Sequence, residues 1–303
     1  MIPKEALEIL RKHHYKVVGK HSAVKLCHWT KKSILTKGER FCYKQKFYGI
    51  KSHRCLQMSP SVAWCQHRCL FCWRPVEHTL GEEINVSLDE PSFIVEKSIE
   101  AQRSLLSGYW GEKRVDRKDM EEAWNPKHAA ISLAGEPTTY PYIDELIEEY
   151  HKHGFTTFLV TNGMHPERLE KVKPYQLYLS LIGYDEESYK RICRPTIKDG
   201  WQRLMKSLEI FSGKKQRKVI RLTLVKGYNL EHAEKFAKLI ELASPTFIEA
   251  KGYVHVGFSR QRLRRENMPT FDEVKEFAIA LEKATGYKIK DYVEESKVVQ
   301  LAK

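Results

Sequence analysis

The sequence predicts an α/β fold in which strands and helices alternate to form a closed or partly closed barrel. From residue 128 onward, short apolar runs of strand length alternate with segments of helical periodicity. This pattern is typical of parallel strands joined by right-handed crossovers. No G-x-G-x-x-G pattern follows the first strand, which argues against a dinucleotide-binding sheet. Polar residues follow several of the expected strands. In barrels of this kind the active site lies at the carboxyl-terminal ends of the strands, so these residues are candidates for it.

The elements are expected in a definite order along the chain. An amphipathic helix is expected over residues 3–15, and residues 16–60 lose clean periodicity. A helix is expected over 91–107, and residues 108–124 are polar enough for a surface excursion. The tail around 287–301 can supply a final strand. Between these segments we expect strands at 128–134, 155–161, 176–182, 218–225 and 246–256, and helices near 143–150, 199–211, 230–242 and 271–282.

Composition favours a polyanionic partner. Lysine and arginine number 52 against 39 acidic residues, which gives a formal net charge of +13. Such a surplus indicates nucleic acid before membrane, and the 15 Tyr, 12 Phe and 6 Trp offer surfaces on which an unpaired base can stack. We find no signal peptide and no apolar run of membrane-spanning length, so we expect a cytoplasmic protein with no membrane partner.

Six of the seven cysteines lie between residues 27 and 72, which indicates metal ligands in a reducing compartment. Cys65, Cys69 and Cys72 form a C-x3-C-x2-C motif with Phe71 directly before the third cysteine. Three thiolates on one loop can hold three irons of a 4Fe-4S cluster and leave the fourth iron open. The alternative is a zinc site of Cys3His type with His67 or His78, although zinc motifs usually come as paired ligands.

The other cysteines have a weaker pattern. Cys27, Cys42 and Cys55 are too far apart in sequence for one ligand loop, so a shared metal would require that folding brings them together. From their spacing alone they fit separate core positions or a partial zinc site as well as a second cluster. Cys193 is expected to be structural.

The C-x3-C-x2-C motif with its aromatic residue resembles the signature of the radical S-adenosylmethionine (SAM) enzymes. In that family SAM chelates the open iron, and one electron cleaves it to methionine and a 5'-deoxyadenosyl radical. The resemblance implies an incomplete, TIM-like (β/α) barrel of the radical SAM type, here residues 61–303, preceded by a cysteine-containing extension, residues 1–60. It also implies that SAM is contacted by the aromatic residue of the cysteine loop and by polar residues on or after the strands, where a glycine lets the ligand approach the backbone. These are Phe71, Gly135, Glu136, Pro137, Asn162 and Ser180.

A closer resemblance extends from about residue 20 to the end of the chain. The block from Arg40 to Pro75, together with AlaGlyGluProThr and TyrAspGluGluSerTyr, is similar to the tRNA 4-demethylwyosine synthase family. This resemblance implies that Cys27, Cys42 and Cys55 hold a second 4Fe-4S cluster at which pyruvate binds. It also implies that Lys44 forms a Schiff base with pyruvate, with Lys251 as a second candidate.

The reaction implied is the condensation of N1-methylguanosine at position 37 of tRNA-Phe with two carbons of pyruvate, which gives the tricyclic base 4-demethylwyosine. The radical would abstract hydrogen from the N1-methyl group of a base extruded from its stack. We expect a monomer that resembles archaeal stand-alone enzymes and takes electrons from an external flavodoxin or ferredoxin. Phosphate contacts are expected from the arginines at Arg74, Arg260, Arg262, Arg264 and Arg265.

Two other functions remain open from the sequence. One is a radical SAM enzyme with an auxiliary cluster that acts on a peptide or a small molecule. The other is a zinc-dependent RNA-binding protein without catalysis, which would not need the polar residues that follow the strands.

Overall fold

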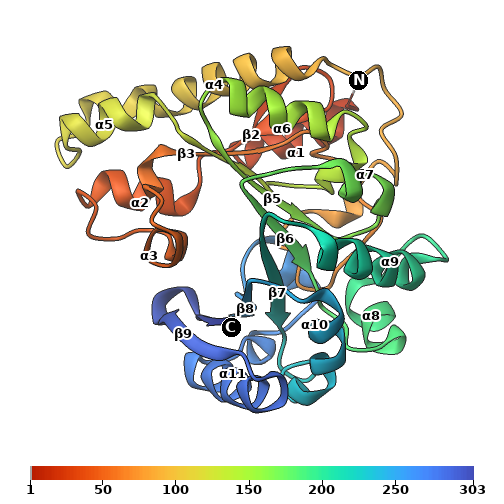
Figure 1. The fold of residues 1–303 in the computed structure, drawn as a ribbon. Coiled ribbons are helices and arrows are strands. Elements are labelled where there is room, and N and C mark those ends of the chain that lie inside the picture. Colours follow the sequence, from red (N-terminus) through yellow and green to blue (C-terminus); the bar gives the residue numbers. More distant parts are fainter. Residues whose placement is uncertain (1) are drawn as a thin grey trace. The chain divides into compact units, whose positions relative to one another are not determined.

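The computed structural model of the protein describes residues 2–303, which divide into two compact units (Figure 1). Unit 1 consists of residues 2–65, 83–160 and 172–175, and unit 2 consists of residues 66–82, 161–171 and 176–303. The units interleave along the chain, and the expected division into an amino-terminal extension, residues 1–60, and a barrel, residues 61–303, stays a prediction.

The strands of unit 1 follow the order β1-β2-β3-β4-β5. β3, β4 and β5 are parallel, whereas β2 pairs antiparallel with β3 and β1 pairs antiparallel with β2. The apolar run at 129–131 is buried in β4, as its composition predicts. The strands span β1 (Lys16–Val18), β2 (Ser22–Val24), β3 (Cys55–Ser59), β4 (His128–Ile131) and β5 (Thr156–Thr161).

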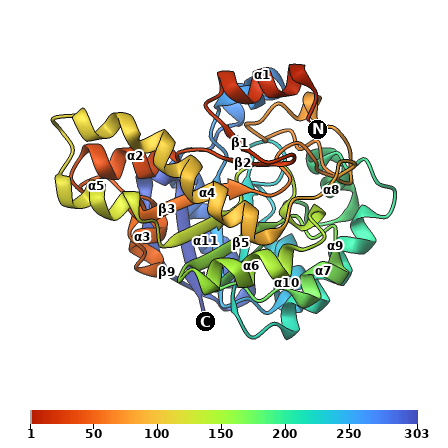
Figure 2. The same ribbon diagram turned by 90° about the horizontal axis from the view of Figure 1, so that it is seen from above.

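The helices of unit 1 form two groups. Figure 1 shows α4 (Pro91–Leu106) beside α6 (Ile143–Lys152), and α1 (Lys4–Lys12) precedes β1 in the chain. The second group surrounds the amino-terminal cysteines. It contains α2 (His28–Leu35), α3 (Tyr43–Tyr48) and α5 (Arg117–Trp124), and both views show α2 and α5 side by side (Figure 2).

The expectation that residues 108–124 are only a surface excursion was wrong for their second half. Asp116 caps α5 by accepting a hydrogen bond from the N–H of Asp119 (3.1 Å), and Met120 and Ala123 are fully buried. These two side chains join an apolar cluster with Ile34 of α2. The polar composition concealed a short helix whose apolar face covers the segment that carries Cys27.

The strands of unit 2 follow the order β6-β7-β8-β10-β9. β6, β7 and β8 are parallel, and β10 pairs antiparallel with both β8 and β9. We expected one strand in the carboxyl-terminal tail, and the structure contains two. The strands span β6 (Gln176–Ser180), β7 (Arg217–Leu224), β8 (Phe247–Gly252), β9 (Lys288–Val293) and β10 (Val298–Ala302).

The helices of unit 2 follow the predicted alternation closely. The expected helix at 230–242 begins as a 3₁₀ turn, Ala233–Phe236, before α10. No helix among residues 2–303 is long and apolar enough to cross a membrane. The helices span α7 (Pro166–Lys171), α8 (Glu186–Cys193), α9 (Gly200–Gly213), α10 (Ala237–Ala243) and α11 (Phe271–Thr285).

Candidate active site

The cysteine loop of unit 2 is anchored to the end of α8. The Arg68 N–H donates to the carbonyl of Cys193 (3.0 Å), and the Leu70 N–H donates to the carbonyl of Ile192 (3.0 Å). The Cys72 N–H then donates to the carbonyl of Cys69 (3.1 Å), which turns the chain between the last two cysteines of the motif. In sequence the motif offers three thiols from eight consecutive residues, a donor set suited to iron; Cys69 and Cys72 belong to unit 2, whereas Cys65 is assigned to unit 1.

The surroundings of Cys69 and Cys72 raise the pKa of both thiols and so favour their neutral form. A hydrogen bond with Cys193 and burial raise the pKa of Cys69 well above its usual value. Burial also raises the pKa of Cys72, and the charges of Arg74 and Arg262 offset part of that rise. Iron would supply the missing positive charge on binding.

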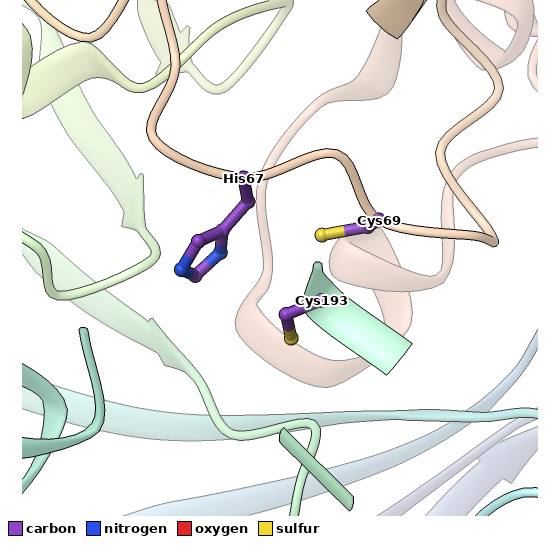
Figure 3. A group of neighbouring side chains, drawn as sticks. All are labelled: His67, Cys69 and Cys193. Atoms are coloured by element: carbon purple, nitrogen blue, oxygen red, sulfur yellow. The ribbon is translucent and has the colours of Figure 1, made fainter. Parts of the chain in front are cut away.

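Cys193 lies closer to the motif than the sequence indicated. Figure 3 shows the side chains of His67, Cys69 and Cys193 near one another, and their donor atoms lie within 4.8 Å of one another. Two thiols and an imidazole are zinc-type ligands, so a cluster-free protein can hold a single ion here. The Nε2 atom of His67 also lies 2.8 Å from the Tyr189 hydroxyl. His78, the other histidine considered for a zinc site, is exposed.

The turn after β4 in unit 1 is tightly built around Gly135. This residue has φ +64°, and a Cβ there would lie 1.8 Å from the Ser61 carbonyl oxygen and 2.5 Å from that of Trp64. The absence of a Cβ makes room for these two carbonyls, and the predicted contacts of Gly135 and Pro137 with SAM stay predictions. The Glu136 N–H donates to the Trp64 carbonyl (2.8 Å). The turn is thereby fixed to the segment that leads into Cys65.

The carboxylate of Glu136 is buried and engaged locally. It accepts hydrogen bonds from the N–H and the hydroxyl of Thr138, at 3.1 and 2.6 Å. The Glu136 carbonyl accepts a hydrogen bond from the Ser61 hydroxyl (2.6 Å), and Pro137 begins a short 3₁₀ turn. The structure therefore gives Glu136 a role in shaping the turn, and its contact with SAM stays a prediction.

Asn162 and Ser180 of unit 2 lie at strand ends, as predicted. The Asn162 side chain accepts a hydrogen bond from the Met164 N–H (3.0 Å), which shapes the turn after β5. Ser180 is the last residue of β6 and is partly exposed. Phe71 packs against the apolar cluster of Val225, Tyr253 and Leu263. The predicted contacts of these three residues with SAM remain untested.

Cys27 and Cys42 of unit 1 both act electrostatically on Cys55, although 14 and 12 residues separate the three cysteines in sequence. Burial, followed by the negative charges that Cys27 and Cys42 can carry, raises the pKa of Cys55, and the charge of Lys44 opposes that rise. Cys27 and Cys42 each directly precede a helix, and Cys55 begins β3. The Lys44 Nζ atom lies 5.1 Å from the centre of the Phe158 ring. Folding therefore groups three thiols and a lysine that the sequence leaves scattered.

One face of the unit 2 strands is polar. Arg221 of β7 donates two hydrogen bonds to Glu249 of β8, at 3.1 and 3.0 Å, and its guanidinium lies 4.6 Å from the centre of the Tyr178 ring. Lys251 shares this face, and its Nζ donates to the carbonyl of Ser296 (2.7 Å). Sequence reasoning missed Arg221 and Glu249. Each of the two lies between apolar residues within its strand, and this alternation of polar and apolar residues could have indicated them in the sequence.

The five arginines expected to contact phosphate differ in their surroundings. Arg260, Arg264 and Arg265 are exposed. Arg74 stacks on Trp73, with its guanidinium 4.1 Å from the ring centre. The exposed three stay candidates for phosphate contacts. Arg262 differs, because its guanidinium faces the cysteine loop and its side chain is only 8% exposed.

The strand arrangement and the cysteine loop define a protein of the radical SAM class. The radical SAM superfamily matches residues 59–240, and a family described as wyosine base formation matches residues 242–303. The chain is 58% identical to the SAM-dependent tRNA 4-demethylwyosine synthase of Pyrococcus horikoshii, over 98% of this chain and 88% of the relative. It is 46% identical to that of Methanocaldococcus jannaschii, over 99% of this chain and 96% of the relative. The chain therefore belongs to the SAM-dependent tRNA 4-demethylwyosine synthases.

Solved structures agree with this assignment. A structure of TYW1 with a lysine-pyruvate adduct bound matches with a TM-score of 0.91 at 46% identity, over all of this chain and 96% of that one. A crystal structure of archaeal TYW1 matches with a TM-score of 0.84 at 41% identity, again over all of this chain and 96% of that one. The predicted fold class, an incomplete TIM-like barrel of the radical SAM type, is confirmed.

Proposed function

We propose that this chain builds 4-demethylwyosine from N1-methylguanosine 37 of tRNA-Phe and two carbons of pyruvate, with Lys44 as the residue that binds pyruvate covalently. The observation that carries the proposal is the grouping of Lys44 with Cys27, Cys42 and Cys55 in unit 1. A related enzyme has been solved with a lysine-pyruvate adduct, which supports a reactive lysine in this family.

Two sets of residues would hold the iron. Cys65, Cys69 and Cys72 would hold the cluster that binds SAM, and the amino-terminal three would hold a second 4Fe-4S cluster. With SAM bound, the first cluster would supply the electron that cleaves SAM to methionine and the 5'-deoxyadenosyl radical, which would take hydrogen from the N1-methyl group. The electron comes from an external flavodoxin or ferredoxin, and the chain acts as a monomer in the cytoplasm.

The Lys44 amine would attack the keto carbon of pyruvate and release water, which forms a Schiff base. The charge of Lys44 acts on the Cys55 thiol, one of the three ligands of the proposed second cluster, and that cluster would bind the carboxylate of pyruvate. Lys251 is the weaker candidate, because its ammonium is held by the Ser296 carbonyl on β8 (2.7 Å). The exposed arginines Arg260, Arg264 and Arg265 would contact phosphates of the anticodon stem-loop.

The test is borohydride trapping of labelled pyruvate on reconstituted enzyme, followed by peptide mass spectrometry. We expect one labelled peptide carrying Lys44, and at least a tenfold loss of label in Lys44→Ala. Lys46→Ala is the matched control, because Lys46 lies on the same helix and is exposed. Label on Lys251, or undiminished label in Lys44→Ala, would show that Lys44 is not the reactive amine.

A further inference from the structure

Arg262 makes an unusual set of contacts with the cysteine loop of unit 2. Its Nη2 atom donates to the carbonyls of Cys72 and Arg74, the latter at 3.3 Å, and its Nε atom donates to the carbonyl of Leu70 (3.3 Å). The Nη1 atom forms an ion pair with Glu77. One guanidinium therefore contacts four residues of the segment 70–77.

The residues around Arg262 hold the same segment. The Phe258 N–H donates to the Trp73 carbonyl (3.0 Å). Gly257 has φ +60°, and a Cβ there would lie 2.3 Å from that same carbonyl oxygen. Leu263 belongs to an apolar cluster against which Leu70 packs. Residues 257–263, which we call the clamp segment, thus contact the cysteine loop through a side chain, the backbone and apolar packing.

The chemistry of arginine suits this position. Guanidinium offers five N–H donors in a planar fork, so one side chain can satisfy several carbonyls that water cannot reach. Lysine has no such fork. Burial also limits the screening of the Arg262 charge by solvent, and this charge lowers the pKa of both Cys69 and Cys72. An iron-sulfur cluster held by thiolates is anionic, and reduction makes it more so.

We propose that Arg262 is a positioning residue for the SAM-binding cluster. It fixes the backbone that carries Cys72 and the adjoining Cys69, and it places a buried positive charge beside the cluster. The charge favours the reduced, more negative state of the cluster. The clamp segment lies in the region that matches wyosine base formation, and the cysteine loop lies in the region that matches the radical SAM superfamily. Arg262 thereby makes the loop depend on the wyosine-specific part of the chain.

Three variants of the reconstituted full chain separate the two roles. Arg262→Lys keeps the charge and loses the fork, Arg262→Gln loses both, and Glu77→Gln removes the partner carboxylate. Arg117→Gln is the matched control, because Arg117 is 87% exposed and pairs only with Glu121 at 3.8 Å among the ion pairs of residues 2–303. The readouts are iron release to a chelator and the fraction of reduced cluster at fixed potential, taken from the electron paramagnetic resonance signal that changes when SAM is added.

We expect iron release to be about tenfold faster in both Arg262 variants, because the loop is less ordered. In Arg262→Gln the ratio of reduced to oxidised cluster should fall about tenfold, which corresponds to about 59 mV for one electron. In Arg262→Lys the ratio should stay within about threefold of wild type. Glu77→Gln should not lower the ratio, because it removes a negative charge.

An unchanged ratio in Arg262→Gln would overturn the proposal, whether or not iron is released faster, since the charge would then have no effect on the cluster. Equal falls in Arg262→Lys and Arg262→Gln would overturn it as well. If Arg262→Gln fails to fold, Arg262→Lys still tests the fork through iron release, and a fall of the ratio in Glu77→Gln would contradict the sign of the effect.

Discussion

Replacing Gly135 by alanine should disrupt the turn after β4 far more than its backbone angle alone would cause. A left-handed conformation costs a residue with a Cβ about 1–2 kcal/mol. At Gly135 the new Cβ would also lie 1.8 Å from the Ser61 carbonyl oxygen. Backbone atoms must then move, and overpacking of this kind costs about 1–3 kcal/mol more. We therefore expect Gly135→Ala to lower the free energy of unfolding by about 2–5 kcal/mol.

Gly154→Ala is the matched control, because Gly154 has φ +73° and its Cβ would meet only the mobile end of the Lys127 side chain, at 3.3 Å. It should cost about 1 kcal/mol. Denaturant unfolding gives both values, and equilibrium dialysis gives the affinity for SAM, which Gly135→Ala should weaken. Equal destabilisation by the two variants, with unchanged SAM affinity, would refute the close approach of the carbonyls.

Two further predictions concern buried polar groups. Burial is the main cause that lowers the pKa of His128 to about 4, and the charges of Arg54 and His53 add to the effect. The neutral imidazole therefore contributes fully to the stability of the folded protein above pH 6.5. That contribution is lost as the pH falls from 6.5 to about 4, because the unfolded chain binds the proton first. Thermal melts should show a loss of about 2 kcal/mol over that window in wild type and a smaller loss in His128→Gln, and parallel melts would contradict this. Glu249→Gln should cost about 3 kcal/mol in urea unfolding, because it leaves the charge of Arg221 without its carboxylate; a cost below about 1 kcal/mol would contradict the buried pair.

The sequence predicts the parts of this fold that local patterns encode. The apolar strand runs and most helices have the expected type, because periodicity and strand composition agree there. β1 and β2 are only three residues long each, which is too short for a periodicity to show. The sequence does not reveal α5, because only two buried side chains, Met120 and Ala123, interrupt an otherwise polar segment. Their role becomes visible only in the folded protein, where they pack against α2.

The candidate site divides in the same way. The C-x3-C-x2-C loop is a local motif and was found from spacing alone. The grouping of Cys27, Cys42 and Cys55 depends on folding, and only the family resemblance predicted it. Arg262 could not be separated from its basic neighbours by sequence, since its contacts are with residues about 190 positions earlier in the chain. Cys193 reaches Cys69 only because α8 ends against the cysteine loop.

The number of clusters is the most direct test of the proposed chemistry. Iron, sulfide and zinc should be determined anaerobically in wild type and in a variant with Cys27, Cys42 and Cys55 all replaced by alanine. We predict about eight irons in wild type and about four in the variant. Borohydride should trap no labelled pyruvate on the variant, because the cluster that would bind pyruvate is missing. About four irons in both proteins would remove the second cluster, and zinc in place of iron would contradict the radical mechanism altogether.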